Sequence, residues 1–217
     1  MKDQYFTVNL HGQGEQLIQK SRFIGYVRRV ETEEQAQTFI QEIKKKHHDA
    51  THNCSAYMIG EQNQIQKAND DGEPSGTAGV PMLEVLKKKD LKDTAVVVTR
   101  YFGGIKLGAG GLIRAYSSTT SIALNETGIV QRKLMQKIKL TVDYALLGKV
   151  ENELRNAAYR IETIDYLAHV TFHVLVTMSR VADFQAWIIN MTSNQVVFDL
   201  DGEKYIEIPA RKKEENL

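Results

Sequence analysis

Residues 96–117 read VVVTRYFGGIKLGAGGLIRAYS and decide the fold of the first half of the chain. They overlap residues 95–98, an unbroken apolar run that predicts a strand covered on both faces. Five of the chain's 15 glycines follow this strand: Gly103, Gly104, Gly108, Gly110 and Gly111. Residues 112–124 then predict a helix that ends near Gly128. The stretch therefore predicts a buried strand, a glycine-rich connection and a helix in succession.

The same stretch is positively charged and contains no carboxylate. Arg100, Lys106 and Arg114 lie around the expected start of the helix. The first N–H groups of a helix lack intrahelical partners and lie at its positive end, so this arrangement suits phosphate or another anion. Lys20 and Arg22 would extend the basic surface. The alternative is a connection that needs glycine only for its conformation and leaves its arginines solvated.

Motifs of known enzyme classes do not fit this segment. Gly103 and Gly108 have the spacing that opens a P-loop, but Ala109 stands where that motif needs lysine. The sequence contains neither a G-x-G-x-x-G at a helix start nor a G-x-S-x-G elbow. We therefore assign no catalytic residue.

A second polar segment, residues 69–81, reads NDDGEPSGTAGVP and predicts a long loop. It places Asp70, Asp71 and Glu73 close together, and such carboxylates are ligands for Mg²⁺ or Ca²⁺. No EF-hand ladder follows, however. We favour an acidic turn, or an intramolecular partner for Arg100 or Arg114, and we expect no metal and no cofactor.

Residues 47–54, HHDATHNC, combine three histidines with the single cysteine of the chain. A structural zinc site usually needs a second ligand pair well downstream, and none follows here. Cys54 with His52 as its base is a further alternative, but closeness in sequence does not assemble such a pair. We favour a buried Cys54 with exposed histidines.

Composition sets the broad class of protein. The chain has 217 residues, of which 42% are hydrophobic, and a formal net charge of +1. This balance excludes the overall basicity of a histone-like DNA packager but permits a local basic patch. A single cysteine is typical of a protein in a reducing compartment. No apolar run approaches the ~20 residues that a membrane span needs, and the first residues do not resemble a secretion signal. We expect a cytoplasmic protein with no membrane partner.

The pattern of elements changes near residue 131. Residues 1–131 form the first predicted domain, residues 132–210 the second, and residues 211–217 a charged tail. The second domain shows the order β-α-β-β-α-β, which is the ferredoxin-like arrangement, and its last segment reads as a hairpin around Asp201 and Gly202. The predicted fold class is therefore α+β with two domains.

Four strings together resemble the IMPACT family in its bacterial form. They are KSRFIG at residues 20–25, HNC at 52–54, DGEPSGTAG at 71–79 and TRYFGGIKLG at 99–108. The resemblance implies an N-terminal IMPACT domain similar to domain IV of elongation factor G and to some ribosomal proteins. It also implies a small ferredoxin-like C-terminal domain similar to the last domain of that factor.

The resemblance also implies a role in translation. Eukaryotic members restrain a stress-responsive initiation-factor kinase with the help of an additional N-terminal domain. This chain begins almost directly at the shared domain, so we expect the kinase role not to apply.

We predict a non-catalytic, translation-associated protein that binds RNA or the ribosome through the basic glycine-rich surface. One alternative is an enzyme that holds a phosphorylated substrate at the glycine-rich loop and uses the carboxylates of Asp70, Asp71 or Glu73. The other is a module that binds a translation factor or another protein. The sequence makes no prediction of oligomeric state.

Overall fold

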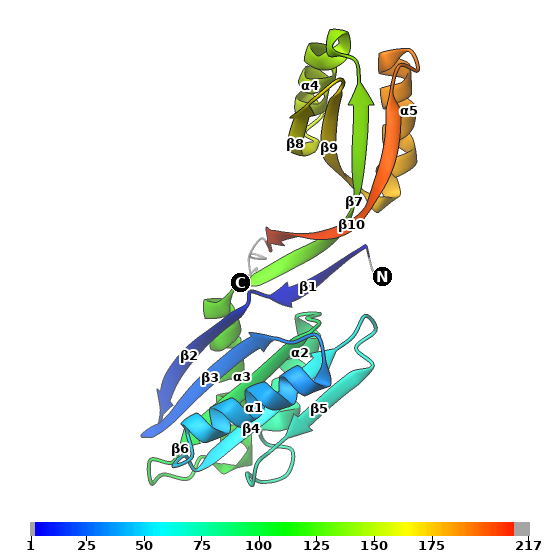
Figure 1. The fold of residues 1–217 in the computed structure, drawn as a ribbon. Helices are drawn as coiled ribbons and strands as arrows, with labels where there is room; N and C mark the ends of the chain where they lie inside the picture. Colours follow the sequence, from blue (N-terminus) through cyan, green and yellow to red (C-terminus); the bar gives the residue numbers. More distant parts are fainter. Residues whose placement is uncertain (1–2, 211–217) are drawn as a thin grey trace, which may run out of the picture. The chain divides into compact units, whose positions relative to one another are not determined.

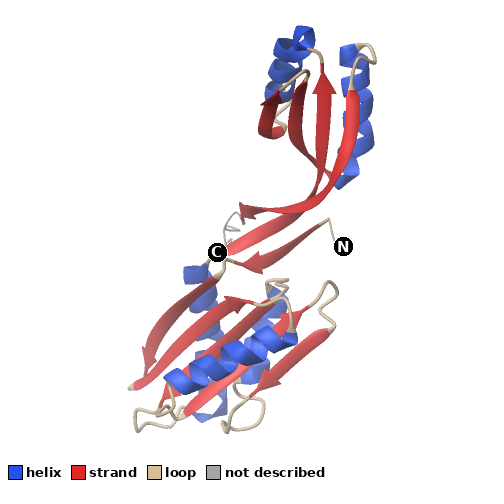
Figure 2. Ribbon diagram, viewed as in Figure 1, coloured by secondary structure: helices blue, strands red, loops and turns tan. Residues whose placement is uncertain are grey.

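The computed structural model describes residues 3–210 and divides into two compact units, mainly Tyr5–Gln131 and mainly Arg132–Glu207. Strands and helices both contribute, and the strands form two five-stranded sheets (Figures 1 and 2). The predicted α+β class is confirmed. Within the described residues, no helix is both long enough and apolar enough to cross a membrane. The predicted tail, residues 211–217, lies outside the described part of the chain.

The first unit is built on one antiparallel sheet in which β6 is the central strand. In spatial order its strands are β2 (His11–Ile18), β3 (Ser21–Arg29), β6 (Thr94–Tyr101), β4 (His52–Ile59) and β5 (Ile65–Asn69). Residues 95–98 of β6 are 0% exposed, as the apolar run predicted. Because successive side chains of a strand point to opposite faces, this run needs cover on both sides.

Helices supply that cover (Figure 1). Helix α1 (Glu33–Lys46) packs its apolar side against Ala95 and Val97. Helices α2 (Gly79–Lys88) and α3 (Gly108–Thr127) pack against Val96 and Val98 on the other face. The N-terminus of α1 forms as its sequence predicts, since the Thr32 hydroxyl accepts the Gln35 N–H at 3.2 Å.

The second unit has the predicted β-α-β-β-α-β order. Its elements are β7 (Ile129–Val142), α4 (Leu147–Asn156), β8 (Arg160–Tyr166), β9 (Val170–Thr177), α5 (Val181–Thr192) and β10 (Val197–Pro209). Single 3-10 turns, η1 (Tyr144–Leu146) and η2 (Met178–Arg180), precede the two helices. The spatial order β10-β7-β9-β8 is that of a ferredoxin-like sheet, and β1 (Gln4–Val8) also pairs with β7.

The predicted hairpin at Asp201 and Gly202 is wrong, because β10 continues through both residues as one strand. Gly202 has a positive φ of 79°, yet its carbonyl oxygen accepts the Gln136 side-chain N–H at 2.8 Å. Strand β10 pairs with β7, which is 14 residues long, so the chain stays extended at Asp201 and Gly202. The local Asp-Gly turn signal therefore does not reverse the chain.

Candidate functional site

The loop between β6 and α3, residues 102–107, is fixed at its start by two neighbouring segments. The Phe102 N–H donates to the Thr51 hydroxyl at 3.0 Å, and the Gly103 N–H donates to the Ser21 hydroxyl at 3.1 Å. Ser21 follows the β2–β3 turn, and Thr51 precedes β4. The loop therefore belongs to one end of the sheet and does not project freely from it.

The glycines of this segment have different roles. A Cβ on Gly103 would lie 2.1 Å from the carbonyl carbon of Lys20, so the chain needs glycine there to pack on itself. Gly104 and Gly108 have positive φ values of 87° and 69°, which favour glycine. Gly111 lies against Leu107. Only Gly110, among these five, has neither a positive φ nor a near neighbour, apart from the flexible guanidinium of Arg114 at 3.7 Å.

Arg100 lies inside the unit, which differs from the exposed position that we predicted. Its Nη1 atom donates to Glu73 Oε1 at 2.7 Å, and the two side chains are 6% and 2% exposed. The guanidinium also lies 5.4 Å from the ring centroids of both Phe23 and Phe102. Glu73 neutralises Arg100 internally, so Arg100 does not form part of a basic surface.

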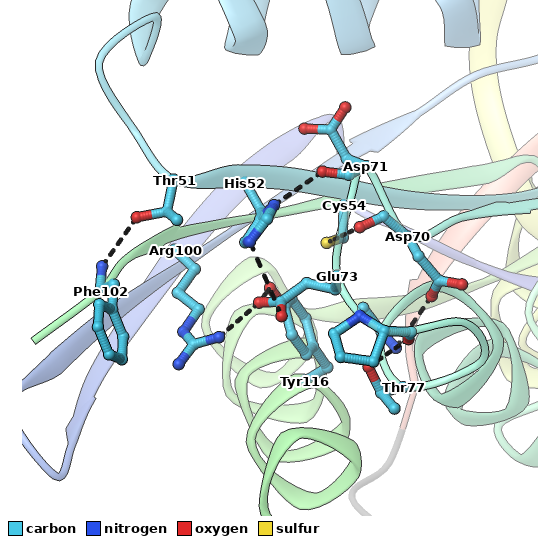
Figure 3. A network of polar contacts seen from close by, with 12 residues as sticks. Thr51, His52, Cys54, Asp70, Asp71, Glu73, Thr77, Arg100, Phe102 and Tyr116 are labelled. Carbon is cyan, nitrogen blue, oxygen red and sulfur yellow. Dashed lines mark hydrogen bonds and ion pairs between the residues drawn. The ribbon is translucent and has the colours of Figure 1, made fainter. Parts of the chain in front are cut away.

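Glu73 is the centre of a polar network (Figure 3). Besides Arg100, its Oε1 atom accepts the Tyr116 O–H at 2.7 Å, and its Oε2 atom lies 3.8 Å from His52 Nε2. Burial, with the neighbouring Cys54 and Glu73, raises the pKa of the Tyr116 hydroxyl far above its usual range, so this group donates a proton in a hydrogen bond. Arg100 Nε is buried and has no hydrogen-bond partner.

The other two carboxylates of the acidic loop have separate partners. Asp70 accepts the N–H groups of Gly76, Ala78 and Gly79 at 2.8, 3.0 and 2.8 Å, which fixes the loop at the start of α2. Burial alone would raise the Asp70 pKa, but these three N–H groups lower it overall. Asp71 accepts the Asn53 N–H and the Lys44 ammonium, both at 2.6 Å. Within residues 3–210, no three potential ligands among His, Cys, Asp and Glu gather as a metal site would require.

Together these contacts match the favoured interpretation of the acidic segment as a structured turn that supplies a partner for Arg100. They leave Arg114 outside the network, as an exposed residue on α3.

Cys54 is fully buried, as predicted, and its thiol donates to the Asp70 carbonyl oxygen at 2.9 Å. Burial raises the pKa of this thiol well above its usual range, so the nucleophilic thiolate does not form readily. His52 is half-buried, and its Nδ1–H donates to the Asp71 carbonyl oxygen at 2.8 Å. Cys54 and His52 therefore do not act together as a nucleophile and its base.

His47 is buried, contrary to the prediction of exposed histidines. Its ring nitrogens lie 2.7 Å from the Tyr26 hydroxyl and 2.9 Å from the Tyr101 hydroxyl. Burial and the nearby Lys46 lower the His47 pKa. Two tyrosines from different strands hold this ring, and no local sequence pattern indicates that contact.

The remaining predicted residues are exposed. Lys20, Lys106 and Arg114 are solvent-exposed, and Arg22 is exposed beside Glu15, with 2.6 Å between Arg22 Nη2 and Glu15 Oε2. The first turn of α3 contains no acidic residue, and no side chain caps it. Phe102 is 46% exposed on the same loop, and sequence reasoning missed it. We call Phe102, Lys106, Gly110 and Arg114 the loop–helix surface.

Relatives of the chain share most of its length. It is 57% identical over 195 residues to "IMPACT family member YvyE" of Bacillus subtilis, an alignment that covers 90% of each chain. The chain belongs to the IMPACT family. "IMPACT family member YigZ" of Escherichia coli is 36% identical over 171 residues, which cover 78% of this chain and 84% of YigZ. The predicted resemblance is thus confirmed.

The two units correspond to separate matches. Residues 19–124 match the Impact N-terminal domain, and residues 140–195 match a domain of unknown function, DUF1949. The first match contains the whole loop–helix surface. A crystal structure described as that of a hypothetical protein is 30% identical and has a TM-score of 0.59; the match covers 93% of this chain and 99% of that one. This structural match therefore extends over both units.

Two glycines provide the first prediction. Gly103→Ala should lower the free energy of unfolding by about 1–3 kcal/mol, because its Cβ would overlap the Lys20 backbone. Gly110→Ala should leave stability unchanged or raise it by up to about 1 kcal/mol, because the site is open and helical. Urea unfolding followed by circular dichroism measures both values. Equal stability of the two variants would show that the loop does not pack as described.

The buried ion pair provides the second prediction. Glu73→Gln and Arg100→Met should each cost about 3–5 kcal/mol of stability, because either change leaves its buried partner uncompensated. The double variant should lose less than the sum of the two. As a control, Glu15→Gln and Arg22→Met remove an exposed pair and should each cost less than about 1 kcal/mol. Similar losses at the two pairs in urea unfolding would contradict the assignment.

Proposed function

We propose that this IMPACT family protein binds RNA, in association with the ribosome, through the loop–helix surface. One observation carries the proposal. The first turn of α3 has no side-chain cap and no acidic residue, and the exposed cations Lys106 and Arg114 lie on either side of it in sequence. The first N–H groups of a helix lie at its positive end and, together with exposed cations, suit the phosphates of a nucleic acid.

Gly110 supports the same interpretation. A glycine inside a helix costs roughly 0.5–1 kcal/mol relative to alanine. Neither backbone conformation nor packing requires glycine at this position, because its φ is not positive and the space around it is open. A ligand that approaches the backbone closely would account for the missing side chain.

The charge distribution supports a local contact with RNA. The whole chain has a formal net charge of only +1, so general attraction to polyanions is weak. Residues 101–117, by contrast, contain two exposed cations and no carboxylate. Contacts of this kind hold phosphates without reading sequence, and they weaken as the salt concentration rises.

Family membership and the resemblance to domains of elongation factor G support a translation-related role in the cytoplasm. An enzyme that holds a phosphorylated substrate has less support. The carboxylates of Asp70, Asp71 and Glu73 each accept hydrogen bonds from the protein itself, and the Cys54 thiol is protonated. Docking of a translation factor or another protein is the alternative that gains support if the RNA-binding test below fails.

Charge reversal of exposed residues tests the proposal. The double variant Lys106→Glu/Arg114→Glu should lose affinity for structured ribosomal RNA and for ribosomes. Its log–log salt dependence should become shallower by about 2, the number of phosphate contacts removed. Filter binding and ribosome cosedimentation at two salt concentrations measure both effects.

The matched control is Lys45→Glu/Lys88→Glu, which makes the same change of charge at exposed positions on α1 and α2. This control should retain most of the affinity. Equal loss in the two double variants would mean that net charge alone governs binding, and unchanged binding in both would reject the loop–helix surface. Arg100→Glu is unsuitable here, because it would place a second carboxylate beside buried Glu73.

A further inference from the structure

Phe102 is an exposed aromatic residue on a firmly held piece of backbone. It is 46% exposed, although its own N–H and that of Gly103 are bonded to Thr51 and Ser21. Gly103 also packs directly on the backbone of Lys20. The backbone that carries this ring is therefore positioned before any ligand arrives, which lowers the entropic cost of binding to it.

The Phe102 ring forms the outer end of a row of groups that contact one another. Inside the unit, the Tyr116 and Phe23 rings meet edge to face, with centroids 5.4 Å apart and an interplanar angle of 89°. The Arg100 guanidinium lies 5.4 Å from the Phe23 centroid and 5.4 Å from the Phe102 centroid. Figure 3 shows the Arg100 side chain between Phe102 on one side and Glu73 on the other.

Glu73 keeps the row in place, because its carboxylate holds both Arg100 and the Tyr116 hydroxyl. The guanidinium thus lies over one face of the Phe102 ring, while nearly half of the residue is open to solvent. A flat ligand that enters from the open side would extend the row by one more layer. Nucleobases stack on aromatic side chains in this way, whatever their sequence.

Nearby charge favours a nucleic acid over an apolar protein segment as the ligand. Lys106 is exposed four residues further along the loop, and exposed Lys20 contacts Gly103 through its backbone. Two exposed carboxylates of this unit have partners within it, Glu15 with Arg22 and Asp49 with the Tyr101 hydroxyl. A flat apolar surface edged by free cations suits a base together with its phosphate.

We infer that Phe102 is a stacking platform for an unpaired base of the bound RNA, with the phosphates of that strand held by Lys106 and the start of α3. The inference rests on the function proposed above and specifies the ligand as single-stranded or looped RNA. A continuous duplex offers no free base face and should gain nothing from Phe102.

The test uses the full chain and a twelve-nucleotide single-stranded RNA that carries 2-aminopurine at its centre, with the matching duplex for comparison. Phe102→Ala should weaken binding of the single strand about tenfold or more and leave the duplex affinity unchanged. Phe102→Trp should retain affinity and quench 2-aminopurine fluorescence at least as strongly as the wild type. Ile105→Ala, which truncates an exposed apolar neighbour that is 41% exposed, should have little effect.

Phe102→Leu separates stacking from simple apolar contact. It should behave like the alanine variant, and a leucine variant that binds as well as the wild type would overturn the inference in favour of an apolar contact. If Phe102→Ala binds normally while Lys106→Glu/Arg114→Glu does not, the RNA-binding surface stands and the stacking platform is rejected. If the wild type binds neither RNA at low salt, the proposed function itself fails.

Discussion

The buried pair of Glu73 and Arg100 is the constraint on which the rest of the site depends. Removing two charges from water is costly, and the attraction between them offsets that cost only with good geometry and further hydrogen bonds. Here the Tyr116 hydroxyl completes the shell of the carboxylate, and two aromatic rings flank the guanidinium. The pair thereby connects three segments that are distant in sequence: the acidic loop, the end of β6 and the first half of α3. Either charge alone would be buried without a counter-ion, so we expect the three segments to become ordered together. The position of the loop that follows β6 then depends on all three.

Three consecutive residues at the end of β6, residues 100–102, place their side chains in three different environments. Strand alternation sends Arg100 toward α3 and Tyr101 toward α1, where Tyr101 contacts buried His47. The next residue, Phe102, leaves the sheet, and its ring covers the guanidinium from outside. Interior packing thus decides where the exposed ring and the following cations are presented. The same principle explains the five glycines of residues 103–111, since four of them let the chain turn or pack on itself, while the space around Gly110 is open.

Local sequence patterns predicted much of the fold. The features that they did not predict depend on contacts between segments that are distant in sequence. The apolar run of β6, the Thr32 cap and the order of elements in the second unit depend on neighbouring residues, so the sequence indicates them directly. The Asp201–Gly202 turn signal was local too, but pairing with β7 overrode it. For Arg100 the sequence left two interpretations, a place on the basic surface and a partner in the acidic loop. Glu73 lies 27 residues away from it, and spacing alone could not choose between solvent and that carboxylate. The sequence did not indicate Phe102, because a lone aromatic residue has no periodic signal and its contact with Arg100 is visible only in the structure.

Native-state hydrogen exchange in Glu73→Gln tests most directly whether the ion pair holds the loop. The variant keeps the shape of the side chain but leaves the Arg100 charge without its counter-ion. The amides of Phe102 and Gly103 should then exchange at least about tenfold faster than in the wild type. Amides of β9 in the second unit should keep their rates. Unchanged exchange at Phe102 and Gly103, or an equal acceleration in β9, would contradict the account.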